Sequence, residues 1–163
     1  MSELRAGIAV CKTITTETAH RLMNYVGKCA SIHGHSYKWE VTAALLDRGV
    51  AANGISLDFG DLKAAMRKVI YEPFDHALVL SIDDPLAPAC TPPYLMANAA
   101  DGTPQKIVIF PWNPTAEKFA SYAAMQLQEI YGNNADPGFD ILRVRVWETA
   151  NSYGQWTVGS EED

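Results

Sequence analysis

The sequence predicts an α+β fold in which helices cover one face of an antiparallel sheet. Patterns typical of strands lie at both ends of the chain, and two patterns typical of helices lie between them. The expected order is strand, strand, helix, short strand, helix, strand, strand. A sheet with one apolar face must bury that face against another layer, which the helices would form. A chain of 163 residues is long enough for one domain with a core, and we expect a single domain over residues 1–163.

The first two strands are expected at Ile8–Thr16 and from His35 to Ala43. The first segment is rich in β-branched residues, and in the second apolar residues alternate with polar ones. Both patterns are typical of strands with one buried face. Arg21–Ile32, between them, has no clear periodicity and is expected to be a loop.

Two helices are expected in the middle of the chain. The first begins after Asp58, which can cap it, and is expected to end at Pro73. The second begins with Asn113 as N-cap and Pro114 in its first turn, and it runs to Gly132.

The remaining segments are a loop, a short strand and a hairpin. Ser81 to Pro104 is dense in Pro, Asp and Ala and is expected to be a long loop. Lys106–Phe110 is expected to be a short strand. Ile141–Thr149 and Gly154–Val158 are expected to form a closing hairpin.

Composition excludes several classes of function. The net charge is −6 and no run of Lys and Arg stands out, so we expect no nucleic-acid partner. No apolar run approaches about 18 residues, and the first five residues lack a signal-peptide pattern, so we expect neither membrane insertion nor export. An odd number of cysteines, three, then indicates reduced thiols and a cytoplasmic location. Cys11 and Cys90 are assigned no function.

A metal site is predicted from three of the four histidines. His33 and His35 are two residues apart, so in a strand their side chains share a face. A catalytic zinc ion takes three protein ligands and keeps one position open. His20 lies at the end of an earlier strand-like run that can pair antiparallel with the strand of His35. We therefore predict that His20, His33 and His35 bind Zn²⁺.

Two further groups carry acid–base chemistry. Cys29 lies four residues before His33, and its thiolate, which nearby cations such as zinc favour, is a candidate base. His76 follows Asp75 directly, and a carboxylate that orients an imidazole makes a proton relay. Adjacent side chains on extended backbone diverge, so the partner of His76 is open between Asp75 and Glu148.

Six motifs, taken together and in this order, resemble the 6-pyruvoyl-tetrahydropterin synthase and 6-carboxytetrahydropterin synthase family over almost the whole chain. They are Ala19-His20, Cys29-x-x-x-His33-Gly34-His35, Leu57-Asp58-Phe59, Asp75-His76, Pro114-Thr115-Ala116-Glu117 and Trp147-Glu148-Thr149. The three-residue gap between Cys29 and His33 resembles the bacterial 6-carboxytetrahydropterin synthase of the queuosine pathway.

The resemblance implies the tunnelling fold, an antiparallel four-stranded sheet with two helices packed on one face that assembles into rings. It implies a homo-oligomer, commonly a hexamer, with active sites between subunits. It also implies 7,8-dihydroneopterin triphosphate as substrate, zinc as cofactor, and release of acetaldehyde and triphosphate. Glu148 is then the pterin anchor, since a carboxylate accepts two parallel hydrogen bonds from the amidine-like edge of the ring. Thr115 and Glu117 are open between a substrate-binding role and a helix-start role.

Two alternatives stay open on the sequence. The same scaffold can make 6-pyruvoyl-tetrahydropterin by eliminating triphosphate. A non-catalytic, zinc-stabilised binding domain would instead use Cys29 as a fourth ligand in a closed site. A third family variant uses a glutamate near the cysteine position. Ala30, Ser31 and Ile32 offer no glutamate, which argues against that variant.

Overall fold

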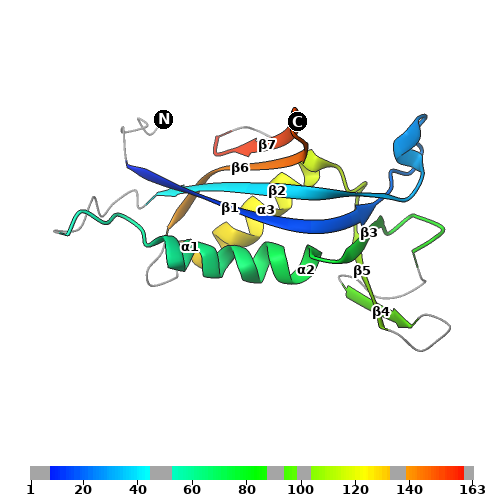
Figure 1. Cartoon of the computed structure of the whole chain (residues 1–163), viewed down its shortest axis with the longest axis horizontal. Coiled ribbons are helices and arrows are strands. Elements are labelled where there is room, and N and C mark those ends of the chain that lie inside the picture. The colour runs from blue at the N-terminus through cyan, green and yellow to red at the C-terminus, as the bar shows by residue number, and fades with distance from the viewer. Residues whose placement is uncertain (1–7, 45–52, 88–93, 99–103, 133–138, 160–163) are drawn as a thin grey trace.

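The computed structural model describes residues 8–44, 53–87, 94–98, 104–132 and 139–159. They form a seven-stranded mixed sheet with the strand order β4-β5-β3-β1-β2-β6-β7. Figure 1 shows α1 (Phe59–Met66) below β1 and α3 (Ala116–Tyr131) crossing behind the long central strands. The α+β class is as predicted, but the expectation of a four-stranded, wholly antiparallel sheet is wrong.

The centre of the sheet is a long antiparallel ribbon of β1 (Ala9–His20) and β2 (His33–Ala44). A hairpin of β6 (Asp140–Thr149) and β7 (Ser152–Thr157) continues the sheet beside β2. These four strands are the ones predicted at the two ends of the chain. β1 continues past Thr16 to its last residue, His20.

Three further strands among the described residues make the sheet mixed, and one of them, β5, contains the predicted short strand Lys106–Phe110. β3 (Ala77–Ser81) pairs parallel with β1, and β5 (Pro104–Phe110) pairs parallel with β3. β3 was not predicted because it is a short, nearly continuous apolar run without the alternation that marks a half-buried strand. β4 (Tyr94–Asn98) pairs antiparallel with β5, so part of the predicted loop Ser81 to Pro104 is a strand.

The first helix contains three segments. α1 (Phe59–Met66) continues through the π-helical turn η2 (Arg67–Tyr71) into α2 (Glu72–Phe74). Asp58 caps α1 as predicted, because its side chain accepts a hydrogen bond from the Gly60 N–H at 2.6 Å. The prediction that Pro73 ends the helix is wrong by one residue, because Pro73 lies in α2, after the π-helical turn, and the helix ends at Phe74.

α3 (Ala116–Tyr131) packs against β6 and β7. Its N-cap is Thr115 rather than the predicted Asn113, since Thr115 Oγ1 accepts a hydrogen bond from the Lys118 N–H at 3.3 Å. Asn113 instead binds the loop between β1 and β2. Its amide exchanges hydrogen bonds of 2.8 and 3.0 Å with the main chain of Met23, which anchors the loop between β1 and β2.

The core lies between the sheet and the helices. Trp39 is fully buried, stacks on Phe74 and donates from Nε1 to Thr16 Oγ1 at 2.9 Å. Burying a large apolar side chain of this kind stabilises a fold by about 1.5–3 kcal/mol. None of the described helices is both long and apolar enough to cross a membrane.

Candidate metal centre and active-site cavity

Three histidines meet where β1 ends and β2 begins. His20 is the register partner of His33, and Thr18 is the partner of His35. Residues two apart share a face, so all three imidazoles lie on the helix-covered face of the sheet. One ring nitrogen from each of His20, His33 and His35 lies within 4.8 Å of the other two.

Main-chain carbonyls occupy one nitrogen of the His20 ring and one of the His33 ring. His20 Nδ1 donates to Pro114 O at 2.7 Å, and His33 Nδ1 donates to Ser31 O at 2.8 Å. Their Nε2 atoms therefore carry lone pairs. His35 Nε2 is buried and has no hydrogen-bond partner among the described residues. Three converging nitrogens, one of them buried without a partner, fit the ligand set of a zinc ion.

Burial also favours the ligating form of His20. Desolvation lowers the pKa of His20, and the hydrogen bond to the Pro114 carbonyl opposes this shift only in part. The positive forms of His33 and His35 lower it further. The ring is thereby held neutral, which is the state that binds a metal ion.

Tyr37 connects the triad to Glu148. Its hydroxyl donates to Glu148 Oε1 at 3.1 Å and lies 3.0 Å from His20 Nε2. Burial, followed by the charge of Glu148, raises the pKa of Tyr37, which keeps the hydroxyl protonated as a donor. Tyr37 was missed in the sequence, although it continues the i, i+2 series of His33 and His35 on one face of β2.

Five of the predicted site residues line a cavity of about 290 Å³. They are His20, Cys29, Thr115, Glu117 and Glu148. Cys29 lies in the short 3-10 turn η1 (Lys28–Ala30), and its carbonyl accepts a hydrogen bond from the Leu22 N–H at 2.8 Å. Thr115 both caps α3 and lines the cavity. Its position at the helix start is therefore compatible with a position in the cavity wall.

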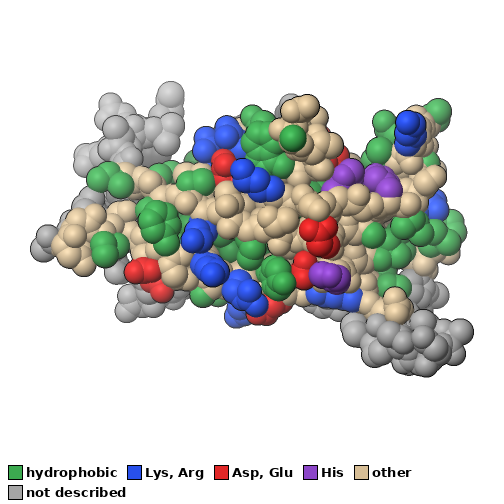
Figure 2. All heavy atoms as spheres, viewed as in Figure 1, with side chains coloured by type: hydrophobic (Ala, Val, Ile, Leu, Met, Phe, Trp, Pro, Cys, Tyr) green, Lys and Arg blue, Asp and Glu red, His purple; other side chains and the backbone are tan. Residues whose placement is uncertain are grey.

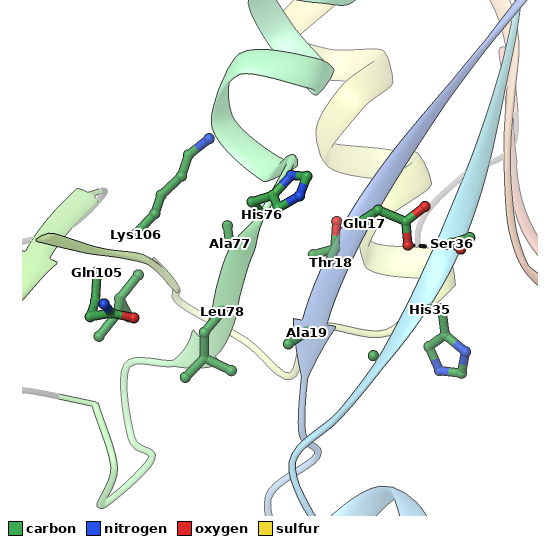
Figure 3. A pocket seen from close by; sticks show the side chains of 12 residues that line it. Glu17, Thr18, Ala19, His35, Ser36, His76, Ala77, Leu78, Gln105 and Lys106 are labelled. Atoms are coloured by element: carbon green, nitrogen blue, oxygen red, sulfur yellow. Dashed lines mark hydrogen bonds between the residues drawn. The ribbon is translucent and has the colours of Figure 1, made fainter. Parts of the chain in front are cut away.

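Asp75 and His76 lie elsewhere. The residues that line the cavity of Cys29 do not include them. His76 lines a second cavity of about 650 Å³, together with His35 of the triad (Figure 3). On the face shown in Figure 2, histidine side chains are visible at two separate places.

The Asp75 carboxylate and the His76 ring are in direct contact. Asp75 Oδ2 accepts a hydrogen bond from His76 Nδ1 at 2.8 Å. The expected divergence of the two side chains is wrong because His76 has a φ of 55°, in the left-handed region, and not an extended backbone. In this chain the carboxylate partner of His76 is Asp75, and Glu148 belongs to the other cavity.

Several donors hold the Asp75 carboxylate. Burial by itself would raise the pKa of Asp75, but hydrogen bonds from the Glu17 N–H, His76 and Tyr71 outweigh it and lower the pKa. The Glu17 N–H lies 3.1 Å from Asp75 Oδ1. An ionised Asp75 keeps the proton of His76 on Nδ1 and leaves Nε2 free at a ring that is 79% exposed.

Comparisons with known proteins identify the family of the chain. The family model for 6-pyruvoyl tetrahydropterin synthase matches residues 9–157. The chain is 28% identical over 148 residues to the 6-carboxy-5,6,7,8-tetrahydropterin synthase of Haemophilus influenzae, covering 90% of this chain and 96% of that protein. It is 30% identical over 152 residues to the synthase of the same name from Rickettsia typhi, covering 90% and 97%.

Solved structures share the fold. An uncharacterized protein from Wolinella succinogenes superimposes with a TM-score of 0.71 at 20% identity, over 93% of this chain and 98% of that one. The 6-pyruvoyltetrahydropterin synthase of Plasmodium vivax superimposes with a TM-score of 0.60 at 18% identity, over 91% and 97%. With its sequence matched from the first strand to the last, the chain belongs to the 6-pyruvoyl tetrahydropterin synthase family.

Proposed function

We propose that this chain is a zinc-dependent 6-carboxy-5,6,7,8-tetrahydropterin synthase. It converts 7,8-dihydroneopterin triphosphate and releases acetaldehyde and triphosphate, as a step of queuosine biosynthesis in the cytoplasm. Relatives that carry this enzyme's name, at 28–30% identity over 90% of the chain, support the proposal. The observation that carries it is the cavity in which a histidine of the triad, a thiol and a carboxylate meet.

His20, His33 and His35 hold the zinc ion in this proposal. A bound Zn²⁺ supplies a Lewis acid that polarises the hydroxyl and carbonyl oxygens of the substrate side chain. Pro114 O and Ser31 O fix the rings of His20 and His33 by accepting from their Nδ1 atoms. Such outer hydrogen bonds set the orientation of ligand rings before a metal ion arrives.

Cys29 and Glu148 act on the substrate from the walls of one cavity. As a thiolate, Cys29 removes a proton from the carbon of the substrate side chain. Glu148 accepts two hydrogen bonds from the pterin edge, and the Tyr37 hydroxyl holds its Oε1 in place. Thr115 and Glu117, at the start of α3, complete the substrate-binding wall.

Asp75 and His76 form the proton relay, in which His76 exchanges a proton through its free Nε2. Because they lie outside the cavity of Cys29, we propose that a second copy of the chain supplies them. The active site then lies between subunits of a ring, with a hexamer as the expected assembly.

The test is a comparison of Cys29→Ala with Cys11→Ala, which removes an exposed thiol on β1. Each protein is loaded with zinc, its metal content is measured, and the products from dihydroneopterin triphosphate are identified by mass spectrometry. We expect Cys29→Ala to keep zinc and to lose turnover by about 10²–10⁴-fold, the typical contribution of a general base. Cys11→Ala should behave as wild type.

Other outcomes decide between the alternatives. A pyruvoyl product from the wild-type chain would assign it to the sister reaction, in which triphosphate is eliminated. Loss of zinc from Cys29→Ala would show that Cys29 is a fourth ligand in a closed, non-catalytic site.

A further inference from the structure

β5 brings a lysine onto the turn that carries Asp75 and His76. Lys106 Nζ donates to the carbonyl of Glu72 and, at 3.0 Å, to the carbonyl of Asp75. Figure 3 shows the Lys106 side chain extending from β5 toward the end of the helix that precedes His76. A cation at this place also suits the negative end of the helix dipole.

The peptide group between Asp75 and His76 is held on both of its sides. Its carbonyl oxygen accepts from Lys106 Nζ, and its N–H, that of His76, donates to Glu17 O at 2.7 Å. The main chain of Glu17 also reaches the Asp75 carboxylate, because its N–H donates to Oδ1 at 3.1 Å. A lysine from β5 and one residue of β1 therefore fix the orientation of this single peptide.

This orientation matters because His76 adopts a left-handed backbone conformation. A non-glycine residue with a φ of 55° is disfavoured and persists where its surroundings over-determine it. The same conformation turns the His76 ring back onto the Asp75 carboxylate, with Nδ1 and Oδ2 2.8 Å apart. Without the hydrogen bond from Lys106, the turn could relax toward extended backbone, in which the side chains of Asp75 and His76 diverge.

We infer that Lys106 is a positioning residue. By donating a hydrogen bond to the Asp75 carbonyl, it stabilises the turn in which Asp75 orients the His76 ring. Its effect on turnover rests on the proposed function, but its effect on the His76 ring does not. A lysine that only stabilised the helix end would change the stability of the protein and leave the tautomer of His76 unchanged.

The test uses Lys106→Met, which keeps an unbranched apolar stem and removes the ammonium group. Lys68→Met, an exposed lysine of the same helix, is the matched control. Long-range ¹H–¹⁵N NMR of the four imidazoles, with His76 assigned through His76→Asn, reports which ring nitrogen carries the proton. We expect Nδ1–H in wild type and in Lys68→Met, and a shift toward Nε2–H in Lys106→Met.

Kinetics supply the second readout. We expect kcat of Lys106→Met to fall by about 10- to 100-fold with little change in KM, since a small misplacement of a catalytic group costs this much. Lys106→Arg, which keeps a cationic donor, should recover most of kcat. If Lys106→Met does not fold, Lys106→Gln gives the same comparison with a polar tip.

The outcomes separate this inference from the proposed function. An unchanged His76 tautomer in a folded Lys106→Met protein would overturn the positioning role. A changed tautomer in Lys106→Met, combined with no turnover by zinc-loaded wild type, would uphold the positioning role and overturn the proposed function.

Discussion

Main-chain carbonyls accept hydrogen bonds from Nδ1 of both His20 and His33, so the nitrogens that remain for a ligand are their Nε2 atoms. The third ring, His35, has its Nε2 buried without a described partner. Buried polar atoms in native proteins nearly always find a partner. At the scale of single residues, the metal-binding potential of the triad therefore follows from the ring nitrogens that the main-chain hydrogen bonds leave with a lone pair.

At the residue scale, we predict how the contribution of Asp75 to stability depends on pH. An unfolded aspartate has a pKa of about 3.9, and the Glu17, His76 and Tyr71 donors lower the pKa of Asp75 in the folded chain below that value. Asp75 thus stabilises the fold fully above the unfolded pKa, and this contribution is lost as pH falls through the folded pKa. We expect the difference in unfolding free energy between wild type and Asp75→Asn to be largest near pH 7 and to shrink below about pH 4.

Urea unfolding of both proteins over a pH series measures this difference. Asp61→Asn, an exposed carboxylate in the first turn of α1, is the control. A difference for Asp75→Asn that stays constant across the series would contradict the lowered pKa.

At the scale of elements, the N-terminus of α3 and strand β7 form one wall of the cavity that contains Cys29. Gly154, in β7, lies against the main chain at the start of α3, and a Cβ placed on it would come within 2.4 Å of the Glu117 nitrogen. A side chain at position 154 would therefore push α3 and β7 apart. Close packing here keeps Thr115 and Glu117 facing the same cavity as Glu148.

The element-scale prediction is that Gly154→Ala is destabilising, because the methyl group meets backbone atoms that cannot rotate away. Overpacking of this kind costs about 1–3 kcal/mol. Thermal or urea unfolding measures the loss, and KM for the pterin substrate should rise as Thr115 and Glu117 move. Val158→Ala, an exposed change just past β7, should leave stability and KM near wild type. A wild-type unfolding curve for Gly154→Ala would show that the two elements have room to separate.

In the whole molecule, the proposed base and the proposed relay line two different cavities. Cys29 and Glu148 line one cavity, and His76 lines another. A chain arranged in this way supplies two different parts of a site, which is why we propose that neighbouring subunits complete each other.

Complementation tests this arrangement of the whole molecule. Cys29→Ala and His76→Ala, each expected to be inactive, are co-expressed with different tags, and the mixed oligomers are purified on both tags. Activity should return at sites between subunits where the His76→Ala chain supplies Cys29 and the Cys29→Ala chain supplies His76. Mixed oligomers of Cys29→Ala and Glu148→Gln should stay inactive, because both residues line the cavity of one chain. Equal inactivity of both mixtures would place the whole site within a single chain.

The sequence alone was sufficient to predict the elements whose evidence is local. The alternation in β2 placed His33 and His35 on one face, and the pairing of β1 with β2 then placed His20 beside them, as the structure confirms. The closing hairpin and both helices were recognisable in the same way. Periodicity and residue type report which face of an element is buried, and that information lies within a few neighbouring residues.

Other features were decided only by tertiary structure. β3 is buried on both faces and so has no alternation, and its parallel partners β1 and β5 are distant in the chain. Asp75 meets His76 because distant groups, the main chain of Glu17 and the ammonium of Lys106, hold a backbone conformation that the local sequence disfavours. Local periodicity cannot reveal such contacts, because the free energy that maintains them comes from residues brought together only when the chain folds.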